Sequence, residues 1–500
     1  MPGTASSLPP GCLLHRRVRT DFDDNDQTDL IALQPFKILR CVKKAASGFS
    51  PQLQSHADET VRRMDIGVHL ADAPPGISCL GLRGGSPLTN IEAVDKGIVV
   101  MTTTFLHDFG HMLYLVYDAV DGSLHMVPAP ESPCWRFTCL TVRMPIARPR
   151  HGEDFALVLA GKLADDGAGG GEEQDALLLW RPASSSLSPW SEVKKATFPN
   201  KSCVDMRVFQ PDVVFSFNGV GYWADLLRGV AYCLLDTLFN NDGDDDPVVE
   251  FGFFPLPPEL PGADQRRGNS RVAHLEAYRT MRVVQDSIIK LVSIDGFLEH
   301  VDLKDRTLMV WRLSDPDMGW EKEYELRLEA LRGLHGFRDL PKDLTLMYPL
   351  LSTDDHDIVY VALGECRESR RIWKFIPKCA HYLLAINMRN NTIRTSTCLA
   401  DYFGSLDINR VISCDFSRYI CVVGLDLYIM MTETMRQMSL TSLDPSDYDE
   451  AEATKTMKEG PRSWRETLKD EDRFPLPLPA HYYLQPSLAR LAQQVLPDLV

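Results

Sequence analysis

The chain has 500 residues, of which 44% are hydrophobic and 24% are charged, so it can bury a large core and has the composition of an ordinary globular protein. Its formal net charge of −16 argues against broad binding to nucleic acid or to anionic membranes, because long-range electrostatic forces repel both partners. The sequence contains no run of 18 or more apolar residues, so no membrane-spanning helix is expected.

The twelve cysteines are scattered and form no Cys-x-x-Cys pair. The closest pairs, Cys134/Cys139 and Cys414/Cys421, match neither a zinc finger nor a zinc ribbon. Most of the others lie inside apolar runs, where a free thiol packs as a small hydrophobic group. No secretory signal precedes them, so the sequence predicts a reducing compartment, cytoplasmic or nuclear, and no metal or other cofactor.

Residues 1–29 read as a weakly ordered lead that ends in an acidic patch, Asp21–Asp29. Arginines with no acidic residue before Asp21 are also typical of an organellar transit peptide. Prolines at positions 2, 9 and 10 would break the amphipathic helix that such a peptide needs. We therefore expect a first strand that opens at Cys12, and organellar targeting is disfavoured.

Residues 30–85 mix short apolar segments with turns, and from Ile91 onward strand follows strand. The strands predicted in the first half cover 97–104, 112–117, 123–127, 155–160 and 176–180. Those in the second half cover 282–294 (two strands about a turn at 285–287), 296–303, 308–313, 320–328, 346–351, 358–363, 382–387, 393–397, and a late pair, 410–416 with 419–425. Helices are expected only as short pieces, at 323–332, 435–443 and 487–495.

The central stretch Val213–Pro258 is predicted to be a meander of three or four strands. Residues 213–217 alternate in the period-2 pattern of a strand, and Asn218-Gly219 is the strongest short hairpin signal, because both central residues of a type I′ turn need positive φ. Within the stretch, Trp223 is expected in the core between two sheets, Asp225 is expected to bind the turn backbone, and Gly229 supplies conformational freedom.

Many short strands in irregular but recurring units favour an all-β fold, a β-propeller of about six blades, because a closed ring hides most sheet edges. A pair of β-sandwich domains is the alternative. In the propeller interpretation residues 30–435 form the β domain, residues 436–480 are a charged and partly disordered segment, and residues 481–500 carry a short C-terminal helix.

His107 and His111 are spaced as in the His-Glu-x-x-His zinc motif, with Asp108 in place of the glutamate. The motif requires a helix, whereas Gly110 and the flanking segments indicate a hairpin in which residues 108–110 form the turn. We therefore expect no metal at His107 and His111.

Two loops resemble ligand-binding loops only in part. The acidic loop 240–246 lacks the glycine and the glutamate that an EF-hand needs at its sixth and twelfth positions, where Asp245 and Phe251 stand, so a solvated hairpin loop is favoured. The glycine-rich segment 167–171 lacks the Lys-Ser/Thr of a phosphate-binding loop. No Gly-x-Ser-x-Gly motif is present, and the sequence assigns no catalytic, cofactor-binding or metal-binding residue.

The segment Tyr222-Trp-Ala-Asp225, the following Leu227-Arg-Gly229 and the strand Phe253-Phe-Pro-Leu-Pro257 together resemble the plant, mainly grass-expanded, domain-of-unknown-function family sixteen-eighteen. The opening at residues 13–18 resembles the same family, although His15 stands where the family has Asp, and Phe254 stands where Ile is common. The resemblance implies no established activity, so it supplies no catalytic residues.

The sequence therefore predicts a non-catalytic intracellular protein-interaction module whose loops recognise another protein, identity unknown, rather than nucleic acid or a membrane. The alternative is a hydrolase-type enzyme with its site in the propeller channel. Carboxylates about 5–10 Å apart beside a substrate-sized cleft would favour the enzyme. A channel lined only with apolar and backbone groups would count against it.

Overall fold

The computed structural model divides the chain into two compact units, Met1–Cys421 and Val422–Val500, and every residue that it describes belongs to the first. The described residues are 12–19, 37–39, 41–47, 49–71, 76–85, 89–104, 112–130, 146–147, 155–163, 174–182, 190, 192–198, 209, 211–238, 248–260, 275–295, 305–315, 319–338, 340–341, 343–367, 376–399 and 411–419. The segment predicted at 436–480 and the helices predicted at 435–443 and 487–495 lie outside these residues.

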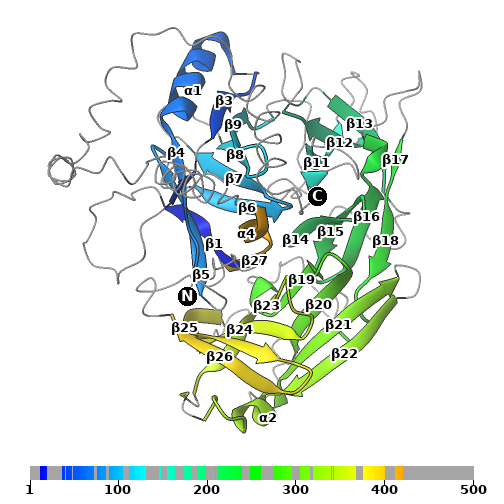
Figure 1. The fold of residues 1–500 in the computed structure, drawn as a ribbon. Coiled ribbons are helices and arrows are strands. Elements are labelled where there is room, and N and C mark those ends of the chain that lie inside the picture. The colour runs from blue at the N-terminus through cyan, green and yellow to red at the C-terminus, as the bar shows by residue number, and fades with distance from the viewer. Residues whose placement is uncertain are drawn as a thin grey trace, which may run out of the picture. The chain divides into compact units, whose positions relative to one another are not determined.

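The first unit is an all-β fold in which six small sheets form a ring, a six-bladed β-propeller (Figure 1). Blades 1 and 2 are joined into one ten-stranded sheet through a single register pair between β1 and β6. The prediction of a propeller with about six blades is confirmed, in preference to two β-sandwiches.

Blades 1 to 3 contain fifteen of the strands. Blade 1 consists of β27 (Val411–Cys414), β1 (Cys12–Arg19), β5 (Ile77–Arg83), β4 (Asp65–His69) and β2 (Lys37–Leu39). Blade 2 consists of β6 (Asn90–Asp95), β7 (Ile98–Thr104), β8 (Met112–Asp118), β9 (Ser123–Pro128) and β3 (Val42–Ala45). Blade 3 consists of β10 (Ile146–Ala147), β11 (Ala156–Leu163), β12 (Gln174–Trp180), β13 (Glu192–Thr197) and β17 (Val249–Glu250).

Blades 4 to 6 are four-stranded. Blade 4 consists of β14 (Val213–Phe217), β15 (Val220–Asp225), β16 (Gly229–Leu234) and β18 (Gly252–Pro255). Blade 5 consists of β19 (Arg279–Val284), β20 (Ile288–Asp295), β21 (Thr307–Asp315) and β22 (Gly319–Arg327). Blade 6 consists of β23 (Thr345–Leu351), β24 (Ile358–Arg367), β25 (Ile376–Asn387) and β26 (Thr392–Cys398). The helices among the described residues are α1 (Pro51–Arg63), α2 (Leu328–Arg332), α4 (Phe416–Tyr419) and the single 3-10 turns η1 (Asp236–Leu238) and η3 (Leu275–Ala277).

The core lies between neighbouring blades rather than at one centre. One cluster of buried residues joins blades 2 and 3, another joins blades 3 and 4, and a third joins blades 4 and 5. The largest cluster joins blades 5, 6 and 1, and α1 packs with blades 1 and 2 in the last cluster. Each sheet therefore buries both faces against its neighbours, which explains why so many strands have near-continuous apolar sequences.

Three connections lock neighbouring blades together. β3 leaves the blade 1 segment and pairs in parallel with β9 at the outer edge of blade 2. β17 leaves blade 4 and pairs in parallel with β13 at the outer edge of blade 3. β27, drawn in orange in Figure 1, lies beside the blue β1, so the first and the last described strands of the chain share blade 1.

The structure confirms the hairpin signals of the central stretch. Asn218 and Gly219 have φ values of 51° and 76°, as a type I′ turn requires, and β14 pairs with β15 across this turn. Gln285 and Asp286 repeat this geometry between β19 and β20. The last strand of the predicted meander is split, because β17 joins blade 3 while β18 pairs with β16.

Several sequence-based boundaries were wrong. The helix predicted at 323–332 begins only at Leu328, because residues up to Arg327 form β22 and pair with β21, which overrides their helix propensity. The lead predicted at 1–29 contains β1, which pairs with β5, β6 and β27, and the strand expected to open at Cys12 is present. The late strand 411–414 pairs with β1, Tyr419 ends α4, and the rest of the strand predicted at 419–425 lies outside the described residues.

Helix α1 was not predicted, because few of its residues are apolar. Of the α1 side chains whose burial is described, only Ala57 and Val61 are fully buried, and Pro51 occupies the first turn, where a missing backbone N–H costs nothing. None of the described helices is long and apolar enough to cross a membrane.

Candidate functional site

The first strands of successive blades meet at the centre of the ring. β14 contacts both β6 and β19, β19 contacts β23, and β23 contacts β27. β14 and β6 are joined near their last residues, because Ser216 of β14 donates a hydrogen bond to Asp95 of β6. The first strands of the blades therefore surround a central channel. One end of the channel lies at the first residues of these strands, and the other end lies at their last residues.

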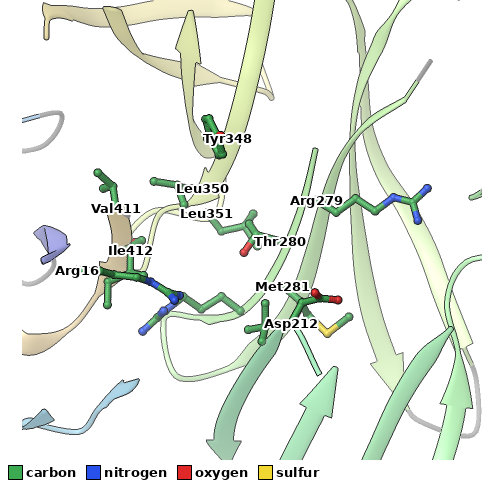
Figure 2. Close-up of a pocket in the computed structure, with 13 residues that line it drawn as sticks. Arg16, Asp212, Arg279, Thr280, Met281, Tyr348, Leu350, Leu351, Val411 and Ile412 are labelled. Carbon is green, nitrogen blue, oxygen red and sulfur yellow. The ribbon is translucent and has the colours of Figure 1, made fainter. Parts of the chain in front are cut away.

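A cavity of about 60 Å³ lies in this channel and is lined by first strands of blades 1, 4, 5 and 6, together with β1 (Figure 2). This volume is several times the volume that one water molecule needs, and it is large enough for a carboxylate group. The lining residues are Arg16, Asp212, Val213, Arg279, Thr280, Met281, Arg282, Tyr348, Leu350, Leu351, Val411, Ile412 and Ser413. The lining contains three arginines and one carboxylate, so it is richer in basic than in acidic residues, although the chain as a whole is acidic.

The arginines differ in what holds them. Arg279 is only 2% exposed, and its Nη1 donates to the Leu226 carbonyl at 2.9 Å. Figure 2 shows its guanidinium pointing away from Arg16. Arg282 is half-buried, and its Nη2 donates to the Val94 carbonyl at 3.4 Å, across the channel in blade 2. Arg16 is also half-buried, so Arg16 and Arg282 are the cations of the lining that solvent reaches.

Asp212 ties the cavity to the turn between β15 and β16. Its Oδ2 accepts a hydrogen bond from the backbone N–H of Leu226 at 3.0 Å, while Arg279 binds the carbonyl of the same residue. Asp225 completes the turn, because its Oδ1 accepts from the Leu227 N–H at 3.0 Å and its Oδ2 accepts from Arg228 at 2.8 Å. The predicted role of Asp225 is therefore confirmed.

Tyr348 lies on the cavity wall with strained backbone. Its φ is 50°, which is unusual for a bulky residue, and the register between β23 and β24 shifts at this point. A β-bulge of this kind re-aims side chains and is found often beside functional sites.

The other end of the channel holds an acidic cluster. Burial raises the pKa of Asp95 to about 6, against the opposing influence of Lys96 and of the hydrogen bond from Ser216. Burial also raises the pKa of Asp415, which follows β27. Arg282 is within electrostatic reach of both carboxyl groups, and neither of them lines the cavity.

Charged side chains also cross-link this acidic end. Arg418 in α4 binds Asp286 at 2.8 Å and Asp354 at 3.1 Å, so it joins blades 1, 5 and 6. The channel is therefore lined by charged as well as apolar groups, and its cavity is smaller than a substrate-sized cleft of about 300 Å³ or more.

The motifs weighed in the sequence contribute nothing that can be placed at this site. His107, His111, the acidic loop 240–246 and the glycine-rich segment 167–171 lie outside the described residues. β7 and β8, which flank His107 and His111, are antiparallel neighbours. Among the described residues, no three His, Cys, Asp or Glu side chains come together as metal ligands would.

Sequence reasoning missed the residues that line the cavity. Asp212 and Arg279 stand at or just before the first residue of the first strand in their blades, and Arg16 follows the four residues of β1 that pair with β27. Only this shared position relates them, and it becomes visible only when the phase of the blades is known.

Comparison with solved structures finds distant likenesses. The N-terminal domain of Nup159 matches with a TM-score of 0.24 and 10% identity, over 78% of this chain and 70% of that one. The S. cerevisiae complex of Dbp5 with Nup159, Gle1, IP6 and ADP matches with a TM-score of 0.23 and 10% identity, over 76% and 69%. A xylan β-1,4-xylosidase from Bacillus halodurans C-125 matches with a TM-score of 0.20 and 12% identity, over 60% and 53%. At these scores the likenesses carry no conclusion about function.

No curated protein matches the chain in sequence. The family model described as protein of unknown function (DUF1618) matches residues 223–360, which run from Trp223 in blade 4 to Tyr360 in blade 6. This central part of the chain is therefore similar to that family, in agreement with the resemblance that Trp223 and Arg228 indicated.

Proposed function

We propose that the protein is a non-catalytic protein-interaction module, and that its channel cavity receives a carboxylate of a protein partner. The observation that carries the proposal is that Arg16 and Arg282, from blades 1 and 5, line one small cavity in which Asp212 is the single carboxylate. Guanidinium groups suit planar carboxylates because they donate two parallel hydrogen bonds. An acidic side chain or a chain-terminal carboxylate has this chemistry.

The rigid frame around the cavity supports the same proposal. Arg279 and Asp212 are both buried and held by the backbone of Leu226, so this side of the cavity is preformed. A preformed site loses little conformational entropy when a partner docks. Arg16 and Arg282 then supply the accessible cations.

The test compares Arg16→Gln with Arg312→Gln. Arg312 lies on β21, two strands outward from the channel, and binds Glu321 at 2.8 Å, so its replacement removes the same charge without touching the cavity. The amount of partner protein captured from native tissue should be at least about tenfold lower with Arg16→Gln than with the wild-type chain, which corresponds to a loss of about 1.4 kcal/mol in binding free energy. With Arg312→Gln the captured amount should stay at the wild-type level. Equal capture by all three proteins would refute the carboxylate site.

A second measurement uses defined probes. Fluorescent acidic decapeptides should bind the wild-type chain, and their binding should weaken when Glu and Asp are replaced by Gln and Asn or when the C-terminus is amidated. The arm that loses binding identifies which carboxylate the cavity receives. Unchanged binding in both arms would contradict the proposal.

The enzyme alternative rests on a different observation, the raised pKa values of Asp95 and Asp415. Burial raises the pKa of both carboxyl groups, that of Asp95 to about 6, and neighbouring carboxyl groups with raised pKa values are candidates for a general acid–base pair. Turnover of glycoside or ester substrates by the wild-type chain, with loss in Asp95→Asn, would establish it. An Asp95→Asn variant with unchanged protein capture and no change in any hydrolysis would leave the interaction module as the function.

A further inference from the structure

The ring is closed by one short pair of strands. β27 has only four residues in register with β1, namely Val411, Ile412, Ser413 and Cys414 opposite His15, Leu14, Leu13 and Cys12. Leu13 and Leu14 are fully buried and join the cores on the two faces of blade 1. The Cys414 carbonyl also accepts a hydrogen bond from Thr353, 3.4 Å away in blade 6. This strand pair is therefore the seam of the propeller.

Two cysteines face each other across the seam. Cys12 and Cys414 are direct partners in the antiparallel register, and their Sγ atoms are 3.7 Å apart. Cys12 is 4% exposed and Cys414 is fully buried. In the described part of the chain this is the one pair of thiols within hydrogen-bonding distance.

The backbone geometry of the pair suits a disulfide. Directly opposed residues of antiparallel strands have Cα atoms about 4.5–5.5 Å apart, inside the range of about 4.4–6.8 Å that disulfides span. Only the sulfur atoms must approach, from 3.7 Å to a bond length of about 2.05 Å, which side-chain rotation supplies without moving either strand.

The two thiols are not equivalent. The hydrogen bond from Cys414 lowers the pKa of Cys12, and the Ser417 backbone acts in the same direction against the effect of burial. The same contact and burial raise the pKa of Cys414. Cys12 is thus the thiol that ionises first and attacks, while Cys414 resolves. By contrast, burial alone raises the pKa of Cys79 to about 11 and that of Cys233 to about 12.

We propose that Cys12 and Cys414 form a reversible disulfide that locks the seam of the propeller when the protein meets a peroxide. Cys12 thiolate attacks one oxygen of hydrogen peroxide, the O–O bond breaks, and the departing hydroxide takes a proton to become water. The resulting sulfenic acid on Cys12 is then attacked by Cys414, which forms the S–S bond, and the sulfenic oxygen leaves with a proton as a second water. Two thiols and one peroxide thus give one disulfide and two waters.

The position of the bond determines its effect. It joins residues 402 positions apart, so it encloses nearly the whole propeller in one covalent loop. Loop-closure arguments give the largest stabilisation for such long loops. Without the bond, the seam can open by losing four register pairs, whereas with it the first and the last blade strands stay together. This device is independent of the carboxylate site proposed above.

The test uses the full chain, reduced and then freed of reductant. After treatment with hydrogen peroxide and alkylation of the remaining thiols, non-reducing peptide mass spectrometry should find a peptide that links Cys12 to Cys414. The midpoint of thermal unfolding should rise by about 5 °C or more, and dithiothreitol should reverse both changes.

Matched variants separate the seam from other cysteines. Cys414→Ser and Cys12→Ser should each lose the cross-link and the rise in Tm, whereas Cys79→Ser, which removes another buried thiol of blade 1, should keep both. If a serine variant folds poorly in the reduced state, Cys414→Ala replaces it. A linkage that forms only in urea, a rise in Tm that survives in Cys414→Ala, or oxidation that reaches other thiols while this pair stays reduced would overturn the proposal.

Discussion

Trp223 is the residue whose replacement tests most directly how the blades hold together. It is 2% exposed and packs in the cluster between blades 3 and 4, with its ring 5.1 Å from that of Phe251. A buried Trp contributes about 150–250 Å² of apolar area, which is about 4–6 kcal/mol at roughly 25 cal/mol per Å². Truncation to alanine retains part of this, so Trp223→Ala should cost about 3–5 kcal/mol of unfolding free energy.

The assay is thermal unfolding followed by calorimetry. With an unfolding entropy of about 0.6–0.8 kcal/mol/K for roughly 300–400 folded residues, a loss of about 4 kcal/mol lowers Tm by about 5–7 °C. Trp223→Phe should lose far less, because the ring volume is mostly kept. Trp223→Phe also removes the indole N–H, which is buried without a hydrogen-bond partner among the described residues. A buried unpaired donor costs about 1–3 kcal/mol of stability, so its removal offsets part of the loss.

Trp320→Ala provides a control with the same truncation. Trp320 starts the outer strand of blade 5, is only half-buried, and donates its Nε1 hydrogen to the Pro255 carbonyl at 3.0 Å. We expect a smaller loss, about 1–2 kcal/mol. A Trp223→Ala protein that melts within about 1 °C of the wild type, or no lower than Trp320→Ala, would refute the assignment of Trp223 to the core between blades.

Two further predictions concern the channel and the turn beside it. Between about pH 4 and pH 6, Asp95 holds a proton in the folded chain that it has released in the unfolded chain, where its pKa is the ordinary 3.8. Stability, measured as Tm, should therefore fall as pH rises through this window. Asp95→Asn should flatten this fall, and an unchanged slope of Tm against pH would contradict the raised pKa. Gly229→Ala should lower Tm by several degrees, because the φ of Gly229 is 152° and a Cβ there would lie 2.3 Å from the Phe253 ring. Gly333→Ala should change Tm little, because the φ of Gly333 is −76° and its Cβ would meet only a carbonyl oxygen at 3.3 Å. Equal changes in Tm for the two variants would refute the steric argument.

Local signals made the blades predictable. Alternating or continuous apolar runs closed by Asn218-Gly219 or Gln285-Asp286 specify hairpins through contacts a few residues apart. The roles of Trp223, Asp225 and Gly229 followed from the same short stretch, because a turn and its flanking strands are set by neighbouring residues. Helix α1 and the end of β22 were missed because tertiary packing and strand pairing outweighed weak propensities.

The sequence alone thus determined the all-β class, the approximate number of blades, the family that the central region resembles and the conformation of its turns. Only the tertiary structure decided that β27 returns to β1, that β3 and β17 cross to neighbouring blades, and that Arg16, Asp212 and Arg282 share a cavity. The physical reason is separation along the chain. Pairings between residues hundreds of positions apart depend on ring closure and on burial between blades, and no local pattern of side chains encodes which distant strands will meet.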